Sequence, residues 1–358
     1  MGVKHLLSAA LLLLGSQGFA SGSDSLTVKK NIKTVKIGPE YFDATPVDSA
    51  LLRKLLVKQR LEKKNKESEE LTKYQNTLLL RDLLNETETS DVPNDRIIST
   101  LDLVLEEYRR SNDLKSQSLI YNTYAVYYGK KGETAKAIQY FTEALQLKER
   151  LNDKAGMIKI SENLAALYKI SGNYPKAIIH DETYIRLNLS LRKTAQAAEG
   201  YLSMAESKLL QNKYSESEYC VLKKALPMFT RLGNKAGRLK SFQSLAKIYY
   251  AQQKFSEAKW FFIQAQTLAA KLEDKEALIS AHIQLAAVKN ALGEHEMALE
   301  DYRKAESLAM ENHYQVKLIE IKADMGETYN LLGNYLAAGN ALDEYSRLRE
   351  SLLKSIVL

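Results

Sequence analysis

The chain has 358 residues, a formal net charge of +7 and one cysteine. A single cysteine excludes an intrachain disulfide and a cysteine-based metal cluster, and so modest a positive charge lacks the dense basic stripe typical of nucleic-acid binding. Only five prolines and sixteen glycines occur in a sequence that is 45% hydrophobic, so we expect a folded core of helices joined by short turns.

The N-terminus has the pattern of a secretory signal peptide over residues 1–20. Lys4 precedes an apolar run over 6–14, and small residues flank a cleavage point before Ser21. The run is too short for a permanent membrane anchor, and no other apolar stretch reaches membrane-spanning length. We therefore predict an exported chain, periplasmic or extracellular, that is soluble after the signal peptide is removed.

The next two segments are a linker and a basic helical region. Residues 21–45 are polar and predict a flexible linker, whereas 46–114 predict N-terminal capping helices and a degenerate repeat. Between Arg53 and Lys66 there are seven Lys or Arg residues and one Glu. This segment is either the solvated face of a helix that caps the N-terminal end of the fold, or a contact for an acidic partner or a membrane surface.

One turn recurs at a fixed spacing through the rest of the chain. Its marker residues are 40, 40, 41, 40 and 40 positions apart: Gly132, Gly172, Asn212, Gln253, Gly293 and Gly333. A second turn recurs in phase with the first, at 151–156, 232–237 and 272–277. A constant period of this size predicts a solenoid, and the three- and four-residue spacing of apolar residues between the turns predicts two helices in each repeat.

Small residues occupy one equivalent position in the first helix of every repeat. They are Ala125, Ala165, Ala205, Ala246, Ala286 and Gly326. A small side chain allows two helices to approach closely, so that stacking of adjacent repeats buries apolar faces that one repeat cannot bury alone.

The order of a small residue, an aromatic residue, a turn glycine and an Ala–aromatic–Ala series resembles the tetratricopeptide repeat. Gly132, Ala137, Phe141 and Ala144 show it in the first repeat. The resemblance covers six repeats over 115–358 and implies an all-α, right-handed α-solenoid of antiparallel helix pairs that mediates protein–protein interaction. It extends to exported repeat proteins and to extracytoplasmic sensor regions of Bacteroidetes-like bacteria.

Two repeats depart from this pattern. Asp181 and Tyr184 stand in the second repeat where an aromatic residue and an alanine are expected. In the third repeat Ala225 lies 13 positions after Asn212, against 12 for the same interval in the first repeat. We therefore expect an irregular turn, wider than that of an α-helix, between Ser217 and Ala225.

The sequence contains no convincing catalytic, cofactor-binding or metal-binding pattern. His295 and Glu296 resemble the start of a zinc-protease motif, but Leu299 stands where the second histidine is required. Cys220 is expected to be a half-buried apolar residue. We predict a protein that is not an enzyme and that takes no cofactor.

In tetratricopeptide repeats the first helices line a concave groove, so the resemblance implies a partner site there. Spacing assigns to this groove Asn122, Val126, Glu162, Lys169, Glu199, Glu206, Gln243, Lys247, Tyr250, Ile283, Asn290, Glu327 and Asn330. Their mixed charges fit a protein or peptide rather than a nucleic acid. A merely solvated face, with binding elsewhere, remains open.

Two other functions remain as alternatives. One is a small-molecule or glycan-binding solenoid, although Trp260 is the one tryptophan available for stacking. The other is the sensor half of a membrane histidine kinase system. The last helix ends in Ile356, Val357 and Leu358 with no further helix to cover it. This C-terminal edge is expected to meet a second copy in a homodimer, another partner or a membrane surface, or else to fold back onto the last repeat.

Overall fold

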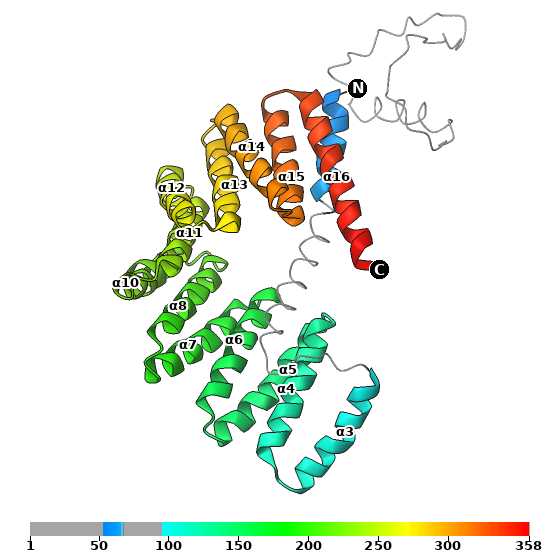
Figure 1. The fold of residues 1–358 in the computed structure, drawn as a ribbon, viewed down its shortest axis with the longest axis vertical. Helices are drawn as coiled ribbons and strands as arrows, with labels where there is room; N and C mark the ends of the chain where they lie inside the picture. The colour runs from blue at the N-terminus through cyan, green and yellow to red at the C-terminus, as the bar shows by residue number, and fades with distance from the viewer. Residues whose placement is uncertain (1–52, 66, 68–94, 358) are drawn as a thin grey trace, which may run out of the picture. The chain divides into compact units, whose positions relative to one another are not determined.

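The computed structural model describes residues 53–65, 67 and 95–357, and apart from short turns these residues are helical (Figure 1). They contain no β-strand. All of them belong to one compact unit, Ser49–Leu358. The predicted signal peptide and linker lie outside the described residues. No helix within the described ranges is long and apolar enough to cross a membrane.

Helix pairs follow one another along the chain after α3 (Asp95–Arg110). Each first helix is joined to its second helix by a tight turn, and each pair contacts the next. The pairs are α4 (Leu114–Lys130) with α5 (Thr134–Arg150), α6 (Lys154–Ile170) with α7 (Tyr174–Ser190), α8 (Thr194–Leu209) with the interrupted helix α9 (Tyr214–Tyr219), η1 (Cys220–Ala225) and α10 (Leu226–Arg231), α11 (Lys235–Ala251) with α12 (Phe255–Lys271), α13 (Lys275–Ala291) with α14 (His295–Glu311), and α15 (Gln315–Leu331) with α16 (Tyr335–Val357). The expected all-α fold of stacked helix pairs is confirmed.

The recurrent turns each contain one residue in the left-handed backbone region. The four marker glycines have φ angles between 72° and 79°, and Asn212 and Gln253 have φ angles of 59° and 60°. Glycine adopts this conformation without a steric cost, which is why it recurs at the fixed spacing. The 40-residue period is therefore the period of a backbone turn.

Polar side chains fix the start of several first helices. Asp153, Asn234 and Asp274 each accept a hydrogen bond from the backbone N–H three residues later, at 2.8–2.9 Å. Such caps satisfy amide groups that have no partner within the helix. These residues belong to the second recurrent turn, so that turn both ends one helix and starts the next.

The interrupted second helix of the third repeat accommodates one extra residue. α9 ends at Tyr219, a π-helix runs over Cys220–Ala225, and α10 begins at Leu226 with Pro227 in its first turn. A π-helix has one more residue per hydrogen-bonded turn than an α-helix, and it absorbs an insertion in this way. The predicted wide turn between Ser217 and Ala225 is confirmed.

A helix over 53–65 packs against the last repeat. Val57 is 1% exposed and lies in one apolar cluster with Ala338 and Leu342 of α16. Leu61, one turn later, packs on the same cluster. The prediction that this basic helix caps the N-terminal end is therefore wrong, because an amphipathic pattern shows that one face is buried but not what buries it.

Ion pairs strengthen this contact between residues far apart in the sequence. Arg60 lies 3.2 Å from Asp343 of α16, and Lys64 Nζ lies 2.5 Å from Glu327 Oε1 of α15. Two of the basic residues thus meet acidic side chains of their own chain. For Arg60 and Lys64, the acidic groups expected from a separate partner are supplied by the last repeat of the same chain.

The C-terminal edge is in part covered. Helix 53–65 lies on one part of α16, while Tyr345 and Leu352 are buried in a cluster with Ile319 of α15. The expectation of an edge with nothing to cover it is therefore wrong. The side chains of residues 355–358 lie outside the described residues.

Candidate functional site

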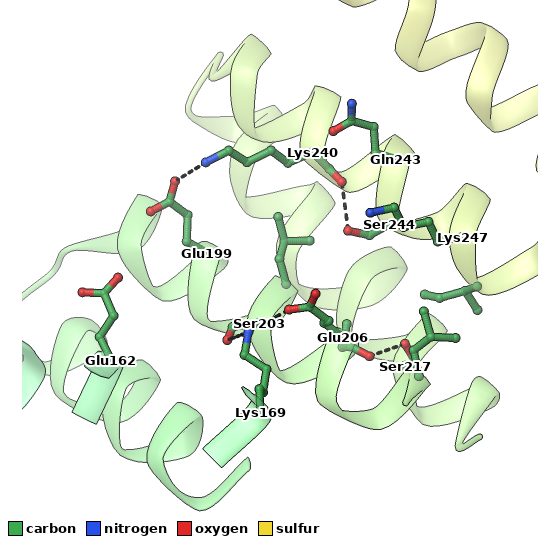
Figure 2. Close-up of a pocket in the computed structure, with 14 residues that line it drawn as sticks. Glu162, Lys169, Glu199, Ser203, Glu206, Ser217, Lys240, Gln243, Ser244 and Lys247 are labelled. Atoms are coloured by element: carbon green, nitrogen blue, oxygen red, sulfur yellow. Dashed lines mark hydrogen bonds and ion pairs between the residues drawn. The ribbon is translucent and has the colours of Figure 1, made fainter. Parts of the chain in front are cut away.

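Three consecutive first helices, α6, α8 and α11, line a groove of about 400 Å³, which we call the central groove (Figure 2). Its lining side chains are mostly charged or hydroxyl-bearing. They are Glu162, Lys169, Glu199, Leu202, Ser203, Ala205, Glu206, Leu209, Ser217, Lys240, Gln243, Ser244, Lys247 and Ile248. The groove therefore spans three repeats and presents a polar surface along them.

Ion pairs bridge the helices across the central groove. Lys169 Nζ on α6 lies 2.7 Å from Glu206 Oε2 and 3.1 Å from Ser203 Oγ, both on α8. Lys240 Nζ on α11 lies 3.3 Å from Glu199 Oε1 on α8. Both members of the Lys240–Glu199 pair are well exposed, so this pair contributes only about 0–1 kcal/mol to stability, whereas Lys169 is 20% exposed and its partner Glu206 is well exposed. A ligand can exchange these pairs for its own at little cost.

Lys247 adds a further positive charge on α11. Its side chain is exposed on the groove lining beside Gln243 and Ser244 (Figure 2). Among the described residues, no ion pair or hydrogen bond engages its ammonium group. An anionic group of a ligand would therefore meet this lysine without displacing another partner.

A buried carboxyl group adjoins the groove on α7. Asp181 is 3% exposed and stands where Phe141, Phe262 and Tyr302 are buried in the corresponding helices of other repeats. Beside it lies a cavity of about 160 Å³, which also includes Ala166, Tyr184 and Gly200 in its wall. Glu162, Lys169, Glu199 and Ser203 line both this cavity and the central groove, so we call it the Asp181 cavity and treat the two as adjoining.

The environment of Asp181 opposes its ionisation. Burial raises the pKa of this carboxyl to about 7, although the Ser203 hydroxyl and the Lys169 ammonium act in the opposite direction. Within the described part of the chain, Asp181 Oδ2 has no hydrogen-bond partner. An unpartnered buried carboxyl oxygen is uncommon, and a donor in the cavity would satisfy it once a small movement of the wall exposes it.

The structure brings together six of the residues that the sequence assigned to the concave groove: Glu162, Lys169, Glu199, Glu206, Gln243 and Lys247. It contradicts two others, because Val126 and Ile283 are 1% and 3% exposed and belong to the core. Helical spacing alone does not separate an inner face from the buried face next to it.

The remaining predicted residues lie outside the central groove. Asn122 lines a separate depression between α4 and α6, and Tyr250 packs edge-on against Phe255. Asn290 Nδ2 donates to Thr328 Oγ1 at 2.7 Å. Glu327 on α15 is paired with Lys64 of helix 53–65. Asn330, also on α15, is half-buried.

Sequence analysis missed several groove residues, chiefly Ser203, Lys240 and Ser244. Lys240 precedes Gln243 by three positions, and Ser203 precedes Glu206 by three. Residues three apart share a helix face, so extending each predicted position by one turn would have found them.

The described residues include no metal-binding cluster, and their one cysteine is buried. Residues 53–65, 67 and 95–357 contain no group of three or more His, Cys, Asp or Glu side chains placed to hold a metal ion. Cys220 is free and buried, with its Sγ 3.8 Å from Met204 Sδ. Burial raises the pKa of this thiol, which keeps it protonated and unreactive near neutral pH.

Comparison with known proteins places the fold. Residues 116–190 match the family model of the tetratricopeptide repeat. BtubC (BKLC) from P. vanneervenii is 22% identical, with a TM-score of 0.51 over 62% of this chain and 93% of that one. A search of curated proteins found no match.

Two other solved structures overlap a larger share of this chain. A signal transduction ATPase with numerous domains from Pyrococcus horikoshii, described as having a tetratricopeptide repeat sensor, is 18% identical, with a TM-score of 0.55 over 86% of this chain and 49% of that one. Aspartyl phosphate phosphatase F from Bacillus subtilis is 12% identical, with a TM-score of 0.51 over 85% of this chain and 95% of that one. At these identities the likeness concerns the fold.

Proposed function

We propose that this tetratricopeptide-like repeat chain is a non-enzymatic scaffold that binds a polypeptide in the central groove. The observation that carries the proposal is the set of exposed ion pairs that bridge α6, α8 and α11. A polypeptide laid across the three helices would exchange these pairs for its own charges and backbone groups. The cost is small because Glu199, Glu206 and Lys240 are already solvated.

Export and a sensory or regulatory role extend this proposal. Export, to the periplasm or the extracellular space, rests on the pattern of residues 1–20 alone. A sensory role is supported by one structure of similar fold that is described as containing a tetratricopeptide repeat sensor. Pairing with a membrane histidine kinase is one form that such a role would take.

The alternative functions have less support in the structure. Trp260 is exposed, but it packs edge-on against Phe261 on α12, which contributes no residue to the central groove. A glycan therefore finds no aromatic platform there. A homodimer or a membrane contact through the C-terminal edge loses its main argument, because helix 53–65 occupies part of that edge.

Capture from a native envelope extract tests the groove. The wild-type chain is compared with the double variant Lys240→Glu/Lys247→Glu, and with a control, Lys235→Glu/Lys271→Glu, that makes the same charge change at exposed positions outside the groove. We expect wild type and control to retain one defined polypeptide, and the groove variant to retain at least tenfold less. Equal retention by all three chains, or retention of sugar without polypeptide, would sink the proposal.

A further inference from the structure

The Asp181 cavity lies in a repeat that has a carboxyl group where three other repeats bury a ring and the remaining two bury Val221 and Leu342. Phe141, Phe262 and Tyr302 fill this place in their own repeats and are 0–2% exposed. In the second repeat the shorter aspartate leaves about 160 Å³ beside the central groove. An apolar cavity of about 150 Å³ takes a ligand the size of benzene, so this space is large enough for a side chain.

We propose that the Asp181 cavity receives one positively charged side chain, lysine or arginine, of the polypeptide bound in the central groove, with the Asp181 carboxylate as its counter-ion. The inference rests on the proposed function and names the chemistry of one position of the ligand. It goes beyond that function because it assigns a specificity-determining residue, Asp181, that lies behind the groove lining.

The charges around the cavity favour a cation. Carboxyl groups of Glu162, Asp181 and Glu199 line it, against the single ammonium of Lys169. Lys169 is paired with Glu206, and Glu199 is paired with Lys240, so with these partners included four carboxyl groups outnumber two ammonium groups. An incoming ammonium or guanidinium would therefore meet a net negative wall, whereas an incoming carboxylate would be repelled.

Asp181 Oδ2, which has no hydrogen-bond partner among the described residues, also favours a cationic side chain. Asp181 Oδ2 accepts no hydrogen bond from the described residues, and a charged donor would satisfy it. An apolar side chain of the same length would fill the space but leave this oxygen unsatisfied. The remaining wall, with Ala166, Tyr184 and Gly200, suits the methylene stem that lysine and arginine carry below their charge.

A metal ion is the other cation to consider, and the geometry disfavours it. Within residues 53–65, 67 and 95–357 no three acidic or histidine side chains converge closely enough to ligate an ion. The carboxyl groups of Glu162 and Glu199 instead stand on two different helices, α6 and α8 (Figure 2).

The test uses capped tripeptides, acetyl-Ala-X-Ala-amide, in which X is lysine, arginine, glutamine or norleucine. Binding is followed by NMR of the full chain with ¹³C-labelled alanine methyl groups, through the Ala166 signal in the cavity wall. We expect saturable shifts with the lysine and arginine peptides, and at least tenfold weaker binding of the other two. Asp181→Asn should weaken binding of the cationic peptides at least tenfold.

A matched control is Asp324→Asn. Burial also raises the pKa of Asp324 to about 7, but this residue lies on α15, outside the cavity, so its loss should leave peptide binding unchanged. Asp181→Phe introduces the ring that three other repeats have at this position and should abolish binding in a folded chain, so a second variant tests the cavity by filling it.

Three results would overturn the subsite: norleucine binding as tightly as lysine, undiminished binding by Asp181→Phe, or no shift of Ala166 with any peptide. Its failure is distinguishable from failure of the groove. If Asp181→Phe still captures the envelope polypeptide while Lys240→Glu/Lys247→Glu does not, only the subsite is wrong. If both variants capture it, the groove proposal falls as well.

Discussion

Val57 anchors helix 53–65 to the last repeat, and Val57→Ala tests that anchoring. The change removes two methyl groups from a side chain that is 1% exposed. At about 0.8 kcal/mol for each such buried group, the loss is roughly 1.6 kcal/mol. The higher helix propensity of alanine offsets about 0.6 kcal/mol of this. The net destabilisation of about 1 kcal/mol corresponds to a roughly fivefold larger population of the undocked helix.

Hydrogen–deuterium exchange of peptides covering 53–65 measures this population. A helix of this length is marginal in water by itself, so its amides lose protection when it leaves α16. Val57→Ala should therefore exchange about five times faster than wild type. The control is Leu55→Ala on the same helix, because Leu55 is 40% exposed and its truncation removes little buried surface. Equal exchange rates in the two variants would refute the anchoring role of Val57.

Three further predictions concern stability, each measured by urea denaturation. Ala258→Leu overpacks a fully buried position of α12 and should cost about 1–3 kcal/mol, whereas Ala270→Leu, at an exposed position of the same helix, should be nearly neutral; equal effects would mean that the helix interface is misplaced. Asp181→Asn should stabilise the chain at pH 8 by up to roughly 4 kcal/mol, because the raised pKa of Asp181, about 7 in the folded chain, makes the wild type lose stability as pH rises from about 4 to 7. The gain should vanish near pH 4, and a gain independent of pH would contradict the raised pKa of Asp181. In the wild type, Lys289 Nζ lies 2.6 Å from Asp301 Oδ2. Asp301→Ala leaves this half-buried ammonium without its counter-ion and should lower the free energy of unfolding by about 3–5 kcal/mol, whereas a loss below about 1 kcal/mol would show that the pair is solvated.

The repeat architecture was predictable because its determinants are local. A left-handed turn favours glycine or asparagine, although Arg192, Gln253, Glu273 and His313 also adopt this conformation, so most of the turns appear in the sequence at their true period. An extra residue between two fixed points of a helix must widen a turn, which is why the π-helix at Cys220–Ala225 could be located from spacing alone.

The contact of helix 53–65 was not predictable for the opposite reason. Its apolar stripe, with Val57 and Leu61, requires a partner surface, but the partner lies more than 260 positions away at Glu327 and beyond. The candidate site shows the same limit. Spacing found six groove residues, yet it also selected the buried Val126 and Ile283. Asp181 was visible as a break in the pattern, but only the structure shows the cavity that the break creates.

The docking of helix 53–65 limits how many repeats this chain can hold. Arrays with neighbour contacts alone lengthen or shorten without a fixed bound. Here the residues that receive the helix belong to α15 and α16, while residues 68–94 join the helix to α3. That connection spans at most about 95 Å when fully extended. If a repeat between α4 and α14 were duplicated, α15 and α16 would have to stay within about 95 Å of α3 for helix 53–65 to contact them. The length of this connection therefore sets the greatest number of repeats compatible with docking.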